Sequence, residues 1–93
     1  MIKFHYHRAQ RDLPRLDVFE GDRMCHVYSD ESLDELIRWG NEHGLRPEWI
    51  HHSSLPHFDA FGERLRICGE GVERRELVED IRAWRRGERR PRE

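Results

Sequence analysis

The sequence predicts an α+β fold: a single compact domain in which a small sheet of short strands is covered by two or three helices. Apolar and polar residues alternate near residues 1–6 and 24–28, as in half-buried strands. Apolar residues recur every three to four positions near 32–43 and 74–86, as in amphipathic helices. Because 93 residues can enclose only one core, we expect one domain over 1–86 and a disordered, Arg-rich tail over 87–93.

Composition narrows the classes of protein to consider. The chain is 39% charged and 35% hydrophobic, against about 25% charged residues in an ordinary domain, so its core should be thin. The formal net charge is -2, so the protein as a whole is not attracted electrostatically to nucleic acid or to an acidic membrane. No apolar run approaches the roughly 18 residues of a membrane span, and no secretory pattern opens the chain. We therefore expect a cytoplasmic protein without a membrane partner.

The first half should contain two paired strands and a helix. The connection over 8–23 is polar and interrupted by Pro14 and Gly21, which predicts a long surface loop. Asp30 or Ser32 can cap the following helix, and Ser32 with Glu35 fits a capping box. Gly44 supplies the left-handed stop. The helical stripe consists of Leu33, Leu36, Ile37 and Gly40.

The second half is less regular. Pro47 cannot continue the helix, so the segment around it should turn and place Trp49 in the core, before a loop over 51–59. Residues 63–68 fit a strand or a short helix equally well. A second helix over 74–86 completes the fold. The expected core residues are Leu33, Leu36, Ile37, Trp49, Leu77, Ile81 and Trp84.

The histidines are the main functional signal. Seven occur in this short chain, and most of them fall in groups near residues 5–7, 26 and 51–57. In an extended His57-Phe58-Asp59 segment, the imidazole and the carboxylate share one face. If that segment closes over the strands carrying His26 and His5 (or His7), nitrogen and oxygen ligands converge. Two or three histidines with a carboxylate suit zinc, manganese or iron.

These residues suggest a metal or acid-base site acting on a phosphoester-like substrate. A bound cation would lower the pKa of water, and Asp59 would orient or deprotonate that water. His57 would share the catalytic work, while Arg64 held the anion. The metal ligands would be His26, His57, Asp59 and His5. The alternative is that these histidines form only local hydrogen bonds in turns.

Two non-enzymatic hypotheses compete with this one. The Arg-rich C-terminus, together with Trp39, could bind nucleic acid or a protein partner. A thin core could also make the chain a structural subunit of a homo-oligomer. No phosphate-binding glycine loop, nucleotide fingerprint or DNA-reading motif is present in the sequence.

Several motifs resemble those of a small bacterial family of unknown function, numbered 4031 among such domains. The resemblance is best over residues 24–59 and looser beyond. The motifs are Cys25-His26, Ser29-Asp30, Leu33-x-Glu35-Leu36, Gly44-Leu45, Trp49 and Pro56-His57-Phe58-Asp59, followed by Gly71-Val72 and Arg75-Glu76-Leu77.

The resemblance implies a shared fold and a shared site around His26, His57 and Asp59, but no reaction. Arg64 resembles the family's basic position after the His-aromatic-Asp motif, and the family pattern favours a helix for residues 63–68. Members begin with a strand that ends in two aspartates. This chain has His5-Tyr6-His7 there, so the acidic corner of the site is either missing or replaced by imidazole.

Overall fold

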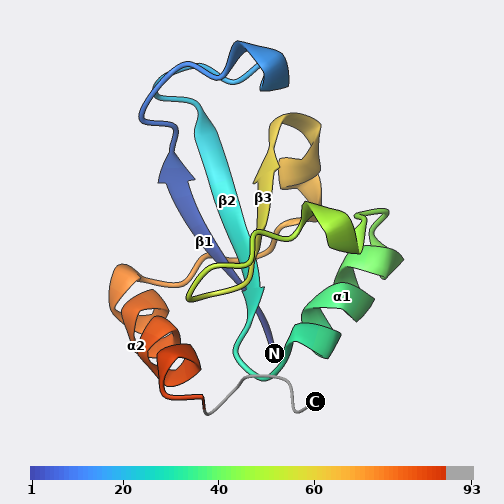
Figure 1. The fold of residues 1–93 in the computed structure, drawn as a ribbon. Coiled ribbons are helices and arrows are strands. Elements are labelled where there is room, and N and C mark those ends of the chain that lie inside the picture. The colour runs from blue at the N-terminus through green and yellow to red at the C-terminus, as the bar shows by residue number, and fades with distance from the viewer. Residues whose placement is uncertain (88–93) are drawn as a thin grey trace.

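Three strands form an antiparallel sheet in the order β1-β2-β3 (Figure 1). They are β1 Ile2–Arg8, β2 Arg23–Ser29 and β3 Phe58–Phe61. The α-helices are α1 Leu33–Glu42 and α2 Arg74–Arg85, and short 3-10 helices cover Pro14–Leu16, Pro47–Trp49 and Gly62–Ile67. This is a computed structural model that describes residues 1–87, so most of the predicted tail lies outside the described residues. The predicted α+β class is confirmed.

The strand β3 was missed by the sequence pattern. We expected a loop over 51–59, whereas Phe58–Phe61 pairs with β2 in an antiparallel register. Four residues are too few for period-two alternation to stand out, and the pairing depends on contacts distant in the chain. The ambiguous segment over 63–68 is helical, because Gly62–Ile67 forms a 3-10 helix directly after β3.

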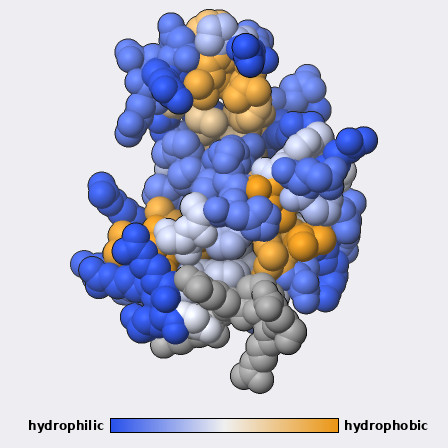
Figure 2. All heavy atoms as spheres, viewed as in Figure 1, coloured by the Kyte–Doolittle hydropathy of each residue, from blue (hydrophilic) through white to orange (hydrophobic). Residues whose placement is uncertain are grey.

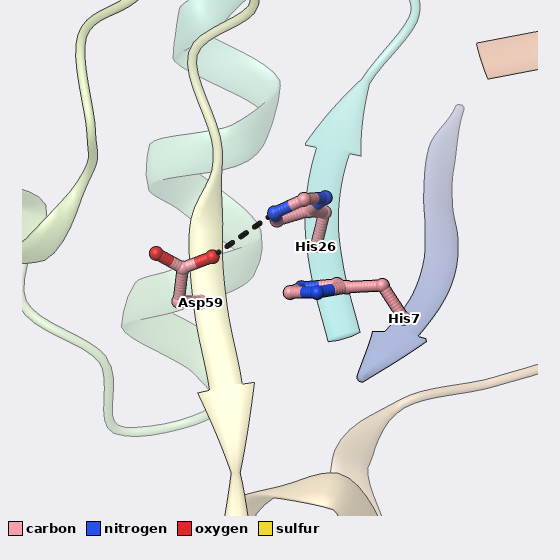
Figure 3. A group of neighbouring side chains, drawn as sticks. All are labelled: His7, His26 and Asp59. Carbon is pink, nitrogen blue, oxygen red and sulfur yellow. Dashed lines mark ion pairs between the residues drawn. The ribbon is translucent and has the colours of Figure 1, made fainter. Parts of the chain in front are cut away.

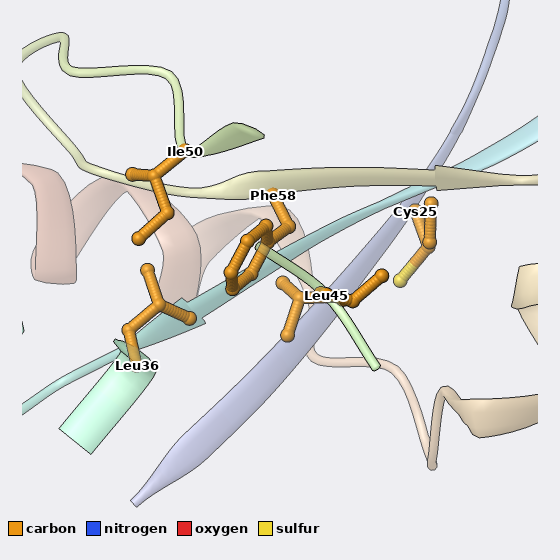
Figure 4. Packing of buried hydrophobic residues seen from close by; sticks show 7 residues of the cluster. Cys25, Leu36, Leu45, Ile50 and Phe58 are labelled. Atoms are coloured by element: carbon orange, nitrogen blue, oxygen red, sulfur yellow. The ribbon is translucent and has the colours of Figure 1, made fainter. Parts of the chain in front are cut away.

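One face of the sheet packs on α1 and builds the main core (Figure 4). Alternation along the strands directs Val27 and Phe58 to this face. Phe58 lies among Leu36, Leu45 and Ile50 in the centre of the cluster. The helix carries Gly40 at the contact, where an added Cβ would lie 2.6 Å from Cζ of Phe58. The missing side chain therefore allows close approach of helix and strand.

The opposite face packs on α2 at one end. Tyr28 is fully buried against Trp84 and Leu55. Its hydroxyl donates to Oδ2 of Asp80 at 2.7 Å, and the indole Nε1 of Trp84 donates to the carbonyl of Ser29 at 3.0 Å. These bonds satisfy polar groups that would be costly to bury alone. The middle of this face carries the histidines.

The start of α1 follows the predicted cap only in part. Oγ of Ser32 accepts the amide of Glu35 at 3.1 Å, as an N-cap should. The Glu35 carboxylate does not return to the Ser32 amide but accepts the hydroxyl of Ser29 at 2.5 Å. The Ser32 amide donates instead to Oγ of Ser29 at 3.1 Å. Gly44 adopts the expected left-handed conformation, with φ of 79°.

The core prediction was wrong for Trp49. This side chain is 42% exposed, whereas Ile50 is buried. The 3-10 helix Pro47–Trp49 turns the chain so that the residue after it, rather than the tryptophan, points inward. Leu36 and Trp84 are buried as predicted. The remaining predicted residues pack at the margins of the clusters: Leu33, Ile37, Leu77 and Ile81.

The predicted surface connection after β1 forms an arm, residues 9–22, at the top of the molecule in Figure 1. The amide of Leu13 donates to the carbonyl of Val18 at 2.7 Å, which closes the tip. Val18 packs with Ala9 and Met24 in a small separate cluster. Figure 2 shows hydrophobic side chains gathered at this end of the molecule, with further hydrophobic patches lower on the same face.

Among the described residues, none of the helices has the length and apolar character required to cross a bilayer. The cytoplasmic location stays a prediction. Cys25 and Cys68 are both free thiols, the first buried and the second only partly buried.

Candidate functional site

A band of imidazoles crosses the middle of the sheet on the face opposite α1. The register pairs His5 with His26, and His26 with Asp59, so one row runs across all three strands. His7 lies two residues beyond His5 and therefore on the same face. Sequence alternation thus brings side chains from β1, β2 and β3 together without any special local geometry.

Three of these side chains form a compact group (Figure 3). His7, His26 and Asp59 each offer one ligand atom, and these atoms all lie within 4.8 Å of one another. Nε2 of His26 is 3.4 Å from Oδ1 of Asp59. The rings of His7 and His26 stack with their centroids 4.0 Å apart. Two imidazoles and a carboxylate, one from each strand, therefore face a common point.

His57 is oriented toward this group by the main chain. Its Nδ1 lies 2.8 Å from the carbonyl of Leu55, so Nδ1 must carry the proton to make this hydrogen bond. In the neutral ring, Nε2 then presents a lone pair 3.6 Å from Oδ1 of Asp59. Metal-ligating histidines typically donate their other ring N–H to a backbone carbonyl in this way.

His51 completes the surroundings of the carboxylate. Its main chain pairs with that of His57, whose carbonyl accepts the His51 amide at 2.8 Å. Nε2 of His51 lies 3.1 Å from Oδ2 of Asp59, and the side chain is 62% exposed. Imidazoles of His26, His51 and His57 therefore surround the single carboxylate of Asp59.

Burial keeps the inner imidazoles neutral. Desolvation lowers the pKa of His26 to about 3, and repulsion from His7 and His57 adds to this effect. The pKa of His5 is also lowered, chiefly by burial. Neutral imidazole is the form that coordinates metals. Nε2 of His7 and Nδ1 of His5 are moreover buried without a hydrogen-bond partner, which is costly for a polar atom.

The structure brings together His26, His57 and Asp59, which the sequence predicted as ligands. The fourth predicted ligand, His5, lies outside the group of three, with its ring centroid 6.0 Å from that of His26. His7, which the sequence offered as the alternative to His5, is in the group. Alternation places both residues on this face, and only the relative position of the strands distinguishes them.

Arg64, the predicted anion-holding residue, lies on the 3-10 helix that follows β3. Its guanidinium is 4.6 Å from the ring centroid of Trp49, which it covers. Both residues line a cavity of about 660 Å³ whose wall also includes His51 and Asp59. Sequence reasoning did not predict this cavity or the role of His51. The only sequence signal for the contact of His51 with Asp59 was the short His51-His52 run that precedes His57.

Comparison with known proteins agrees with the resemblance in the sequence. Residues 12–84 match a family described as Protein of unknown function (DUF4031). The uncharacterized protein YneQ of Bacillus subtilis (strain 168) is 53% identical over 32 residues, which make up 33% of this chain and 32% of that protein. The match thus spans about a third of the relative's length. No solved structure shows significant similarity. Since the family match covers most of the chain, this protein belongs to that family of unknown function.

Proposed function

We propose that this protein is a metal-dependent enzyme that acts on a phosphoester-like substrate, with a divalent ion held by His7, His26 and Asp59. The observation that carries the proposal is the group of three ligand atoms, within 4.8 Å of one another, supplied by three different strands. Side chains on a paired sheet are held more precisely than side chains on loops, so this geometry is preorganised.

The hydrogen-bonding pattern favours a cation over a purely polar cluster. Nε2 of His57 and Oδ1 of Asp59 approach to 3.6 Å, and both are acceptors when the ring is neutral. Nε2 of His7 is buried without a partner. A divalent ion held by Asp59 and His7 would balance the charge of the carboxylate and satisfy the buried lone pair of His7, while Nε2 of His57 kept its own lone pair for proton transfer.

The surrounding residues provide the other parts of a hydrolytic site. A bound divalent ion would supply Lewis-acid charge and lower the pKa of water. Nε2 of His57 is placed to accept a proton from the attacking water, because its Nδ1 is held by the carbonyl of Leu55. Arg64 shares a cavity with Asp59 and offers a forked cation for the phosphate.

The ligand set does not select one metal. Two histidines and one carboxylate leave open positions and occur with zinc, iron and manganese. The donor atoms exclude a preference for calcium or magnesium, which favour all-oxygen sites. Metal identity is therefore an outcome of the experiment rather than an assumption.

The test is direct measurement of metal binding by untagged protein. Titration with Zn²⁺, Mn²⁺ and Fe²⁺ should give one tightly bound ion per chain by calorimetry and elemental analysis. His26→Gln and Asp59→Asn should each weaken binding by at least about 100-fold, because each removes a ligand. The loaded protein should hydrolyse p-nitrophenyl phosphate, and His57→Asn should slow turnover more than it weakens metal binding.

The matched control is His52→Gln. His52 is exposed and next to His51, yet it lies outside the ligand group, so this variant should bind metal like the wild type. The proposal is wrong if wild-type protein binds none of the three ions, or if His52→Gln and His26→Gln weaken binding equally.

A further inference from the structure

The cavity beside the histidines is mainly apolar, and the proposed hydrolytic chemistry does not explain this. Its volume of about 660 Å³ lies in the range of sites for small organic ligands. Leu16 and Trp49 line it although they are 48% and 42% exposed. Large apolar side chains that remain exposed in a chain with so few of them mark a surface for contact.

The cavity shares one residue, Asp59, with the candidate metal centre. Asp59, a member of the ligand group, also lines the cavity, as does His51, whose Nε2 is 3.1 Å from the same carboxylate. Phe61 follows two residues after Asp59 on β3 and therefore lies on the same side of the sheet. A molecule in the cavity would thus contact apolar side chains and reach Asp59 together.

The cavity also carries charge at its wall. The Arg64 guanidinium lies over the Trp49 ring at 4.6 Å, an arrangement that holds the cation beside an aromatic surface. Glu48 lies on the same wall. A ligand with its apolar part on Trp49 would place an attached anionic group near Arg64, and would be disfavoured if its anion lay near Glu48. The charges therefore orient a ligand that is anionic at one end.

We infer that the cavity binds the aromatic group of a small phosphate monoester, with the ring against Trp49 and Leu16 and the phosphate between Arg64 and Asp59. This inference rests on the proposed function and narrows its substrate class to esters of aromatic alcohols. Trp49 and Leu16 are the specificity-determining residues for the apolar part. Of the two parts of the ligand, Arg64 contacts only the phosphate.

The experiment compares three probes by calorimetry on metal-loaded protein: 1-naphthyl phosphate, methyl phosphate and 1-naphthol. 1-Naphthyl phosphate should bind roughly 10- to 100-fold more tightly than methyl phosphate, since the ring leaves water for an apolar wall. Leu16→Ala should remove much of this advantage and leave methyl phosphate binding unchanged. Trp49→Ala should abolish the advantage, and because the ring also lies under the Arg64 guanidinium, it should weaken methyl phosphate binding too, but by a smaller factor than 1-naphthyl phosphate binding. Arg64→Met should weaken both phosphates and leave 1-naphthol unaffected.

Phe19→Ala is the matched control. Phe19 is 46% exposed on the same arm as Leu16 but does not line the cavity, so its variant should keep the full preference for 1-naphthyl phosphate. Because Trp49 and Leu16 are substantially exposed, their variants should fold, and circular dichroism checks this.

Failure of the inference differs from failure of the proposed function. If methyl phosphate binds the loaded protein and 1-naphthyl phosphate binds no more tightly, the aromatic site is wrong and the metal site stands. The same holds if Phe19→Ala and Trp49→Ala reduce the preference equally. If no metal binds while 1-naphthol still binds in a Trp49-dependent manner, the proposed function is wrong and the substrate class with it.

Discussion

At the scale of single residues, the site depends on how one carboxylate is surrounded. Three imidazole Nε2 atoms, from His26, His51 and His57, lie 3.1–3.6 Å from Asp59. The hydrogen bond from His57 to the carbonyl of Leu55 decides which of its nitrogens faces inward. A carboxylate and several imidazole nitrogens that face one point attract a cation more strongly than any of these groups alone.

The lowered pKa of His26 predicts acid sensitivity of the metal-free fold. The folded pKa is about 3 and the unfolded value is near 6.5. Above pH 6.5 the His26 imidazole is neutral in both the folded and the unfolded protein, and the free energy of unfolding is at its full value. As the pH falls from 6.5 toward 3, only the unfolded protein binds a proton at His26, so the free energy of unfolding decreases. Between pH 7.5 and 5.0 the loss from His26 should be at most about 2 kcal/mol.

Urea unfolding at the two pH values, in metal-free protein, measures this effect. His26→Gln should lose less stability than the wild type over this interval, because glutamine does not titrate. His52→Gln, at an exposed position, leaves His26 in place and should lose as much stability as the wild type. Equal acid sensitivity of wild type and His26→Gln would show that His26 titrates normally in the fold.

At the scale of elements, the contact between α1 and β3 holds the edge strand that carries Asp59. Phe58 points to α1 while Asp59 points to the opposite face, so packing of one fixes the orientation of the other. Gly40 creates the space for the Phe58 ring, because its missing Cβ would approach Cζ of Phe58 to 2.6 Å. Packing of the helix on one face is thus coupled to the position of Asp59 in the candidate site on the other face.

Gly40→Ala should therefore destabilise the protein by about 1–3 kcal/mol through overpacking, although alanine favours an isolated helix by about 1 kcal/mol. Because overpacking lowers the free energy of unfolding and helix propensity raises it, the sign of the change measured by urea unfolding shows which effect dominates. Asn41→Ala, at the next and exposed position of α1, should change stability by less than about 0.5 kcal/mol or raise it slightly. Unchanged or increased stability of Gly40→Ala would contradict the close packing.

At the scale of the whole molecule, Lys3 joins β1 to α2. It is the sole lysine of the chain, and its side chain is 11% exposed. Its Nζ lies 2.8 Å from Glu76 and 2.9 Å from Asp80 on α2, and 3.3 Å from Asp30 after β2. The Asp80 side chain is only 5% exposed. This network, buried at Lys3 and Asp80 and exposed at Glu76, fixes α2 against the end of the sheet that lies next to the histidines.

Lys3→Met should cost about 3–5 kcal/mol, because it removes the cation from a buried carboxylate group while keeping the length of the side chain. The free energy of unfolding from urea titration measures the loss. Lys3→Arg keeps the charge and should lose much less. A loss below about 1 kcal/mol for Lys3→Met would place this network among the weak surface ion pairs instead.

The alternatives drawn from the sequence remain predictions at this scale. Binding of nucleic acid or a protein through the Arg-rich C-terminus depends largely on residues 88–93, which lie outside the described part of the chain. Trp39, the aromatic residue assigned to that surface, packs against Phe4 and Phe58 with centroid distances of 5.9 and 6.3 Å. Formation of a homo-oligomer is likewise a prediction, which sedimentation would test.

The sequence by itself determined the parts that depend on local periodicity: the strands near 1–6 and 24–28, the helices near 32–43 and 74–86, and hence the α+β class. It also determined that His57 and Asp59 share a face, because two-residue spacing in an extended segment requires this. Its motifs were sufficient to identify the family.

Only the tertiary structure decided which of these groups meet. Strand β3 is too short to be recognised from alternation, and the choice of His7 over His5 follows from the relative position of strands distant in the chain. The exposure of Trp49 and the cavity that it lines depend on segments that meet only after folding. Periodicity reports the direction of a side chain from its own element, whereas the partner it reaches is set by packing between elements.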